Sequence, residues 1–348
     1  MNIPILNIYY LLCYAWNRLE EGQRVAVSAS DYKTALELLS RVLLSGCNVL
    51  FKRGLDRAYV ERKESYAGIK GKIDFAASLF ASTFRSGKAI CDFDEFEYDV
   101  LQNQIIKSTL SRLSQTKGID KGIGREAWQS AQNFRGIAEV QICLSDFSRV
   151  RIHRNNSIYD FLLRVCRLIF ESTSLDESDG KYHFKSFTDN EKAMAAMFEN
   201  FVRNFYRKET AGLYVVSSDD IRWAASSLTS GGLDLLPKMR TDVTLCSSTR
   251  KFVVDTKYYS QTLSDYRGSE KLHSTNLYQM YSYLRNLEAG SADPRNQFCE
   301  GILLYPTVQK EVDESFKLGG HKVRIATVNL GGAWRDIHNR LLQIIDLS

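Results

Sequence analysis

Three residues that follow an apolar run have types and a spacing suited to metal-dependent chemistry. Asp255, Thr256 and Lys257 come directly after residues 252–254, which are Phe-Val-Val. On a strand, residues two positions apart share a face, so the Asp255 carboxylate and the Lys257 ammonium would lie side by side. Burying two charges at the end of a strand is costly. The triplet is therefore a candidate catalytic site.

Triplets of an acidic residue, any residue and lysine also arise by chance, and about two or three are expected in a chain of this composition. Others occur at 31–33, 61–63 and 179–181. Their settings are typical of a helix cap, a charged run and a turn, and none follows an apolar strand. The triplet at Asp255 is distinguished by what precedes it.

A second carboxylate, Asp242, lies thirteen positions before Asp255 on the preceding strand-like run. If the turn between the runs is centred near Ser248 and Thr249, residues whose numbers sum to about 497 face each other, which pairs the two aspartates. Neighbouring carboxylates repel each other unless a cation lies between them. Two aspartates, a backbone carbonyl and water are ligands that Mg²⁺ takes. The pair therefore predicts a magnesium site.

The elements that must position these residues follow residue 190. Apolar residues at helical spacing predict a helix over 191–208, and a hairpin is the natural connection of the two strands that carry the aspartates. The full expected order is a helix at 191–208, strands at 239–246 and 251–259, a helix at 274–287, strands at 301–305 and 323–330, and a helix from Trp334. We therefore expect a mixed α/β fold with a central mixed sheet flanked by helices.

The first half of the chain also predicts mixed structure. Helices are expected at 5–19, at 30–44 with Ser30 or Asp31 as the cap, at 98–114 and at 158–171. Glycine-rich 54–75 favours short strands and turns, and polar 172–190 favours a linker or long loop.

A strand is expected near residue 148, because Val150 and Ile152 alternate with Arg149, Arg151 and His153. Its basic side is equally consistent with a solvated sheet face and with a contact for phosphate or an acidic partner.

Composition narrows the class of protein. The 348 residues suggest two domains, and 44% hydrophobic with 25% charged residues is typical of a soluble globular protein. No apolar run approaches the length of a membrane span. Seven scattered cysteines without a CxxC pair, and five histidines, favour a reduced cytoplasmic setting and argue against zinc. A net charge of +5 is compatible with binding a polyanion but does not require it.

The residues of the candidate site resemble a known nuclease signature. Pro237, Asp242, Asp255 and Lys257 look like the PD-(D/E)xK motif. Gln279 and Tyr283 are similar to the QxxxY motif of one branch of that superfamily, and Glu199 stands where the superfamily often has an acidic residue. The order of helix, hairpin, helix and strand also resembles the core of that superfamily.

Within this superfamily the chain resembles the McrC family, the nuclease subunits of McrBC-type GTP-dependent restriction systems. The matching stretches are residues 7–10, 14–16, 53–55, 68–73, 103–110, 235–239, 255–259 and 276–279. Several lie outside the nuclease motif, which favours this family over a generic nuclease. The resemblance implies that residues 1–155 dock on an AAA+ GTPase and that residues 156–348 form the endonuclease domain.

The resemblance also implies a role for each residue of the motif. Asp242 and Asp255, with the Thr256 carbonyl, would hold Mg²⁺, which polarises a phosphodiester and lowers the pKa of bound water. Lys257 would orient the attacking water or stabilise charge on the phosphate.

Three further positions take less specific roles from the resemblance. Glu199 would bind the metal through water, whereas Gln279 and Tyr283 would fix the phosphate or Lys257. A structural role remains an open alternative for all three, since Tyr283 and Leu284 also fit an ordinary core face.

Partners follow from the family as well. The sequence lacks the glycine, lysine and hydroxyl pattern of a phosphate-binding loop, so GTP is expected on another chain. The resemblance implies an McrB-like AAA+ GTPase hexamer, whose hydrolysis the N-terminal region would stimulate. The strip at Arg149 and Arg151 and the loop 68–72 are candidate contacts. Double-stranded DNA is the expected substrate, and cutting both strands implies dimerisation of complexes.

The function implied is that of a Mg²⁺-dependent endonuclease subunit of a restriction complex that acts on modified, 5-methylcytosine-containing DNA. Two alternatives remain open: a catalytically inactive scaffold that stimulates the GTPase, and a nuclease subunit of a related system that cuts unmethylated sites. The intact set of two acids and a lysine disfavours the scaffold. A nuclease without a partner is disfavoured by the family-like first half.

Overall fold

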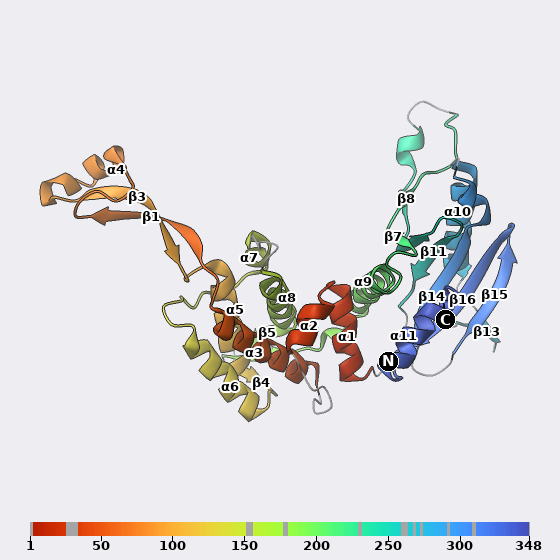
Figure 1. Ribbon diagram of the computed structural model, residues 1–348, viewed down its shortest axis with the longest axis horizontal. Helices are drawn as coiled ribbons and strands as arrows, with labels where there is room; N and C mark the ends of the chain where they lie inside the picture. The colour runs from red at the N-terminus through yellow and green to blue at the C-terminus, as the bar shows by residue number, and fades with distance from the viewer. Residues whose placement is uncertain are drawn as a thin grey trace. The chain divides into compact units, whose positions relative to one another are not determined.

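A computed structural model describes residues 3–25, 34–150, 156–176, 180–228, 232–258, 264–266, 269–271, 274–290, 293–307 and 311–347. The chain forms two compact units (Figure 1). The first, here called the sheet unit, combines Met1–Gly22 with Ser186–Ser348, and the second, the middle unit, consists mainly of Thr34–Lys185. The first helix of the sheet unit is therefore contributed by the opposite end of the chain from its strands.

This division differs from the boundary expected at residue 155. Helix α8 (Ser157–Glu171), expected in the endonuclease domain, belongs to the middle unit, and helix α1 (Ile5–Ala15), expected in the docking domain, belongs to the sheet unit. The reason lies in packing: the fully buried side chain of Leu162 lies against Gly46 of the middle unit, and Asn7 donates to the backbone oxygens of Leu330 and Gly332. Chain order alone does not show such contacts.

The sheet unit is built on a six-stranded mixed sheet with the order β15-β16-β14-β11-β10-β7. Strands β10 and β11 form an antiparallel hairpin, β14 and β16 continue parallel to β11, and β15 is an antiparallel edge strand. Their bounds are β7 Val215–Ser217, β10 Val243–Cys246, β11 Lys251–Thr256, β14 Glu300–Thr307, β15 Asp313–Leu318 and β16 His321–Asn329.

Helices cover this sheet because its central strands are apolar along almost their whole length, as strands buried on both faces are. Contacts join α9 to β10 and β11, α10 to β11 and β14, and α11 to β16, and α1 packs on α9. The helices are α9 Glu191–Glu209, α10 Ser274–Gly290 and α11 Trp334–Ile344. The short pair β8 (Asp220–Ile221) and β9 (Met239–Arg240) forms a separate antiparallel ladder.

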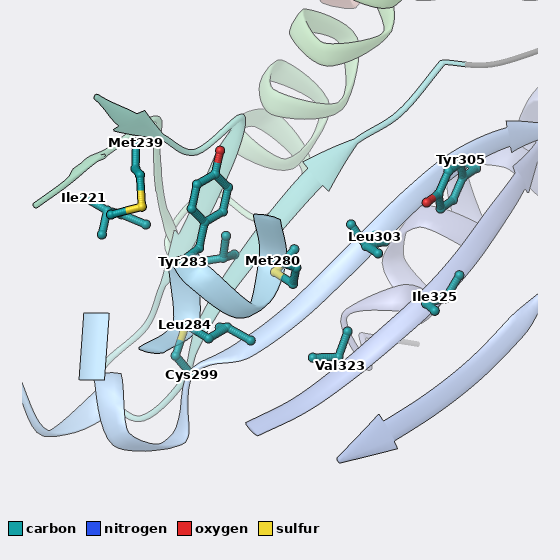
Figure 2. Packing of buried hydrophobic residues seen from close by; sticks show 11 residues of the cluster. Ile221, Met239, Met280, Tyr283, Leu284, Cys299, Leu303, Tyr305, Val323 and Ile325 are labelled. Carbon is teal, nitrogen blue, oxygen red and sulfur yellow. The ribbon is translucent and has the colours of Figure 1, made fainter. Parts of the chain in front are cut away.

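One cluster of buried side chains joins helix α10 to the sheet and to this short ladder (Figure 2). Close approach of the helix depends on Gly301 of β14, where a Cβ atom would lie only 2.7 Å from Sδ of Met280. The labelled members of the cluster are Ile221, Met239, Met280, Tyr283, Leu284, Cys299, Leu303, Tyr305, Val323 and Ile325. This packing fixes the helix that carries Gln279 and Tyr283.

Among its described residues the middle unit packs four long helices and carries an antiparallel ribbon of two long strands and one short strand, with helix α4 near its end (Figure 1). Its helices are α3 Ala35–Arg53, α4 Phe75–Phe80, α5 Leu101–Ser114, α6 Lys121–Asn133, α7 Leu144–Arg149 and α8 Ser157–Glu171. Its strands are β1 Ala58–Tyr66, β2 Lys72–Ile73, β3 Ala89–Glu97, β4 Thr116–Lys117, β5 Thr173–Asp176 and β6 Lys181–Phe184. The α-helix and strands of the described residues not yet named are α2 Leu19–Val25, β12 Ser264–Tyr266 and β13 Ser269–Lys271.

The mixed α/β class is confirmed, and the helices and strands expected after residue 190 occur in the expected order. The single strand expected at 239–246 is instead two strands, β9 and β10, which belong to different sheets, and β7, β8 and β15 were not expected. Two further expectations were wrong. The strand expected near residue 148 is helix α7, and Arg151 and His153 lie outside the described residues. The linker expected at 172–190 contains the antiparallel strands β5 and β6.

Helix α3 begins later than expected, because Thr34 rather than Ser30 or Asp31 caps it; those two residues lie outside the described part of the chain. None of the described helices is long and apolar enough to cross a membrane.

Candidate active site

The β10–β11 hairpin has the expected register, and this brings the two aspartates together. Val243 pairs with Val254, so Asp242 and Asp255 are the next residues beyond the last pair. Oδ2 of Asp242 accepts hydrogen bonds from the backbone N–H of Thr256 at 2.7 Å and from its hydroxyl at 2.8 Å. The Asp242 carboxylate is thereby held against the residue that follows Asp255.

Asp255 is fully buried, with 0% of its surface exposed. Its Oδ2 lies 2.8 Å from Nζ of Lys257, whereas Oδ1 accepts no hydrogen bond from the described residues. Burial and the charge of Asp242 raise the pKa of Asp255 to about 6, and the Lys257 ammonium offsets this only in part. A buried carboxylate with an unsatisfied oxygen is energetically unfavourable unless a further cation binds it.

Lys257 is held by a chain of hydrogen bonds from helix α10. Its Nζ donates to Oε1 of Gln279 at 3.0 Å, and Nε2 of Gln279 donates to the Tyr283 hydroxyl at 2.6 Å. That hydroxyl in turn donates to the backbone oxygen of Arg240 at 2.9 Å. Burial raises the pKa of Tyr283, so its hydroxyl stays protonated as this arrangement requires. Gln279 and Tyr283 thus contact the Lys257 side of the site and not only the core.

Glu199 reaches the site from helix α9 together with Arg203, one turn further along. Glu199 forms an ion pair with Arg203, whose Nε donates to the backbone oxygen of Asp242 at 2.8 Å. Burial and the Asp242 charge raise the pKa of Glu199 above its ordinary value. A pocket of about 360 Å³ is formed here, lined by Glu199, Arg203, Ser218, Arg240, Thr241 and Asp242.

The residues present fit a hard divalent cation. Among the described residues no three His, Cys, Asp or Glu side chains are grouped to hold a metal ion. Two carboxylates with a backbone carbonyl suit Mg²⁺ because this ion keeps several of its own waters. The unsatisfied Oδ1 of Asp255 is the observation that supports this fit.

The structure brings together Asp242, Asp255, Thr256, Lys257, Gln279 and Tyr283, with Glu199 across the pocket. Pro237 makes a structural contact instead: its carbonyl accepts the Trp223 indole N–H. Arg203 and Arg240 were missed. The available signals were the four-residue spacing of Arg203 from Glu199 and the position of Arg240 two residues before Asp242.

Comparison with known proteins shows that the chain is a protein of a restriction system. The family described as McrBC 5-methylcytosine restriction system component matches residues 7–306. The chain therefore belongs to this family.

Among curated proteins, the type IV methyl-directed restriction enzyme EcoKMcrBC of Escherichia coli (strain K12) is 36% identical over 345 residues. The match covers 99% of this chain and 97% of that relative. Among solved structures, a half-complex of Thermococcus gammatolerans McrB AAA+ hexamers with bound McrC matches with a TM-score of 0.56 at 15% identity. The match covers 98% of this chain and 76% of the matched chain in that structure, and the TM-score shows that the two chains share a fold.

Proposed function

We propose that this McrC-like restriction subunit is the Mg²⁺-dependent endonuclease of its complex and hydrolyses phosphodiesters of double-stranded, 5-methylcytosine-containing DNA. The observation that carries the proposal is the juxtaposition of Asp242, Asp255 and Lys257 at the end of the β10–β11 hairpin. Membership of the McrBC family supports DNA as the substrate.

The roles of the side chains follow from their contacts. A Mg²⁺ ion held by Asp242, Asp255 and the Thr256 carbonyl would supply Lewis-acid activation of the phosphate and of a bound water. Lys257 keeps its ammonium at the Asp255 carboxylate, where it can donate to the attacking water or to the phosphate oxygens. Gln279 holds Lys257, and Tyr283 holds Gln279.

Glu199 faces the same pocket from the side of Asp242. Burial and the Asp242 charge raise the pKa of Glu199 despite Arg203, so a further cation in the pocket would favour its charged form. We therefore assign Glu199 an outer role, in which it holds metal-bound water and keeps Arg203 in place.

The second part of the proposal is that a partner AAA+ GTPase binds GTP and that the middle unit docks on it and stimulates its hydrolysis. The solved relative contains McrB AAA+ hexamers with McrC bound. In the middle unit, the ribbon and α4 expose large apolar side chains, with Phe80 95%, Ile69 76% and Tyr59 73% exposed. Apolar surface gathered on a projecting element is typical of an interaction site. Complexes would pair for double-strand cleavage.

The test is cleavage of methylated and unmethylated plasmid with Mg²⁺, GTP and the partner GTPase. Asp255→Ala and Lys257→Ala should each lower cleavage by about 100-fold or more, while stimulation of GTP hydrolysis is retained. Asp336→Ala on α11 and Lys317→Ala on β15 make the same changes of charge at exposed positions and should cut normally. A wild-type chain that stimulates GTP hydrolysis but cuts neither plasmid would instead be a scaffold.

A further inference from the structure

We propose that Arg240 contacts a backbone phosphate of the DNA next to the one that is cut. This inference rests on the proposed nuclease function and assigns a residue that holds the substrate. It is drawn from the placement of Arg240 on the short β8–β9 ladder, from its hydrogen bonds and from the pocket it lines.

The ladder turns Arg240 away from the core. In β9, Met239 is buried in the cluster beneath helix α10, close to Ile221 of β8 and to Tyr283 (Figure 2). Successive residues of a strand point to opposite sides. Arg240 is accordingly exposed and lines the pocket that Asp242 also lines.

The backbone of Arg240 is tied to the catalytic lysine. Its carbonyl accepts the Tyr283 hydroxyl at 2.9 Å, and the chain continues through Gln279 to Nζ of Lys257, with links of 2.6 and 3.0 Å. A surface arginine on a mobile loop would not be placed in this way. The three hydrogen bonds that hold Lys257 therefore also fix the position of the Arg240 backbone, from which its side chain extends.

The charges around the pocket leave Arg240 available to an anion. Arg203 is engaged by Glu199 and by the Asp242 carbonyl. Within the described residues the hydrogen bond and the ion pair of Arg240 involve Nε alone, which donates to the Ser218 hydroxyl at 3.0 Å and lies 4.0 Å from Oδ1 of Asp220. The charges of Arg240 and Glu199 also attract each other in the pocket that both line. The Arg240 and Asp220 side chains are each 68% exposed, so their attraction is weak.

The chemistry of a guanidinium selects the ligand. Its planar fork matches the oxygens of a phosphate. A DNA strand with one phosphate at Asp242 carries another at each neighbouring nucleotide, and Arg240 lies two residues before Asp242. Contacts to phosphate fix register without reading sequence. Arg240 thus holds the strand beside the metal-binding aspartates, whatever the recognition sequence.

The test measures binding of the full chain to a short DNA duplex over a series of salt concentrations, with Ca²⁺ in place of Mg²⁺ and intact DNA verified. The logarithm of the association constant falls as the logarithm of the salt concentration rises, and each phosphate contact adds about 0.9 to the steepness of this slope. Arg240→Gln should lower the slope by about that amount and weaken binding several-fold. Arg240→Lys should keep most of the slope because it keeps the charge, and Arg335→Gln, an exposed change on α11, should leave it unaltered.

Equal slopes for Arg240→Gln and wild type, or no binding by wild type, would overturn the assignment. Kinetics in the complete complex give a second readout, because loss of a phosphate contact raises KM more than it lowers kcat. If the slope falls but wild type never cuts DNA, the phosphate contact stands and the nuclease proposal fails. If wild type cuts DNA but Arg240→Gln and wild type have equal slopes, the nuclease proposal stands and the phosphate contact fails.

Discussion

The Asp255 carboxylate is buried away from water, so the free energy of unfolding should depend on its protonation state. Its pKa of about 6 lies above the ordinary value of about 3.9, so the folded protein binds the proton more tightly than the unfolded chain does. The resulting stability is complete below pH 4 and is lost as the pH rises through 6.

Asp255→Asn should therefore raise the stability of the metal-free protein at pH 7 by about 2 kcal/mol. The difference from wild type should shrink towards pH 4. Adding Mg²⁺ should stabilise wild type by mass action and leave the variant unchanged. Thermal unfolding in EDTA and in Mg²⁺, at both pH values, measures each effect. A variant less stable than wild type in EDTA at pH 7 would show that the Lys257 ion pair outweighs burial.

Thr256 contributes a hydroxyl that aligns Asp242, separately from its carbonyl. Thr256→Val removes the 2.8 Å bond to Oδ2 of Asp242 but keeps the shape of the side chain. One such bond contributes about 1 kcal/mol, so we expect the Mg²⁺ concentration for half-maximal cleavage to rise about five-fold. Thr256→Ser keeps the hydroxyl and should restore the wild-type value. If valine and serine behave alike, the hydroxyl does not align Asp242.

Residues of the site differed in how well the sequence predicted them. Asp242 and Asp255 could be paired because a hairpin register depends only on a local turn. Arg203 and Arg240 could not be assigned, because one acts through a backbone carbonyl on another element and the other through the pocket it lines. Their spacings from Glu199 and Asp242 are visible in the sequence, but such spacings are common and do not by themselves indicate a role in the site.

At the scale of elements, the position of α10 against β14 decides where Gln279 and Tyr283 lie. Gly301→Ala should force α10 outward, because the new Cβ would meet Met280 and Leu284 at 3.0 Å or less. Overpacking of this kind costs about 1–3 kcal/mol. The loss of stability caused by Gly301→Ala should be smaller in a protein that also carries Met280→Ala, because the shorter side chain leaves room for the new Cβ. A double-mutant cycle, with stability measured by urea unfolding, gives this difference.

Gly332→Ala is the matched control, because its nearest neighbour lies at an ordinary 3.6 Å. Additive effects of Gly301→Ala and Met280→Ala would mean that α10 does not depend on this contact.

The elements that the sequence failed to predict are short, polar or at an edge. Five of the six residues of β15 are exposed, and it exists because it pairs with β16. The strand β5 has the polar composition of a loop, β6 is only four residues long, and both are likewise defined by pairing. Buried strands such as β11 are recognisable because they must be apolar, whereas exposed edge strands need no such pattern.

At the scale of the whole molecule, the sequence suggested two domains but not their membership. Helix α1 joins the sheet unit through aromatic packing that no local pattern records: the ring of Tyr14 lies 5.9 Å from Phe201 and 5.6 Å from Trp334. The Tyr14 hydroxyl also donates to Glu209 of α9. Tyr14 and Glu209 are 195 residues apart along the chain. Contacts at such separation are set by the final fold, so a boundary drawn along the sequence splits the unit.

Two compact units with separate cores should unfold as separate transitions, since each buries its own apolar surface. Gly46→Ala tests the middle unit, because its new Cβ would lie 2.2 Å from Leu162 in the packing of α3 on α8. It should lower one calorimetric transition by several degrees, and Gly301→Ala should lower the other. Gly124→Ala, whose nearest neighbour lies at 3.5 Å, serves as the control for the middle unit. A single transition lowered by both variants would mean that the chain folds as one cooperative body. Separate transitions would allow damage to the unit proposed to bind the partner to be distinguished from damage to the proposed nuclease site.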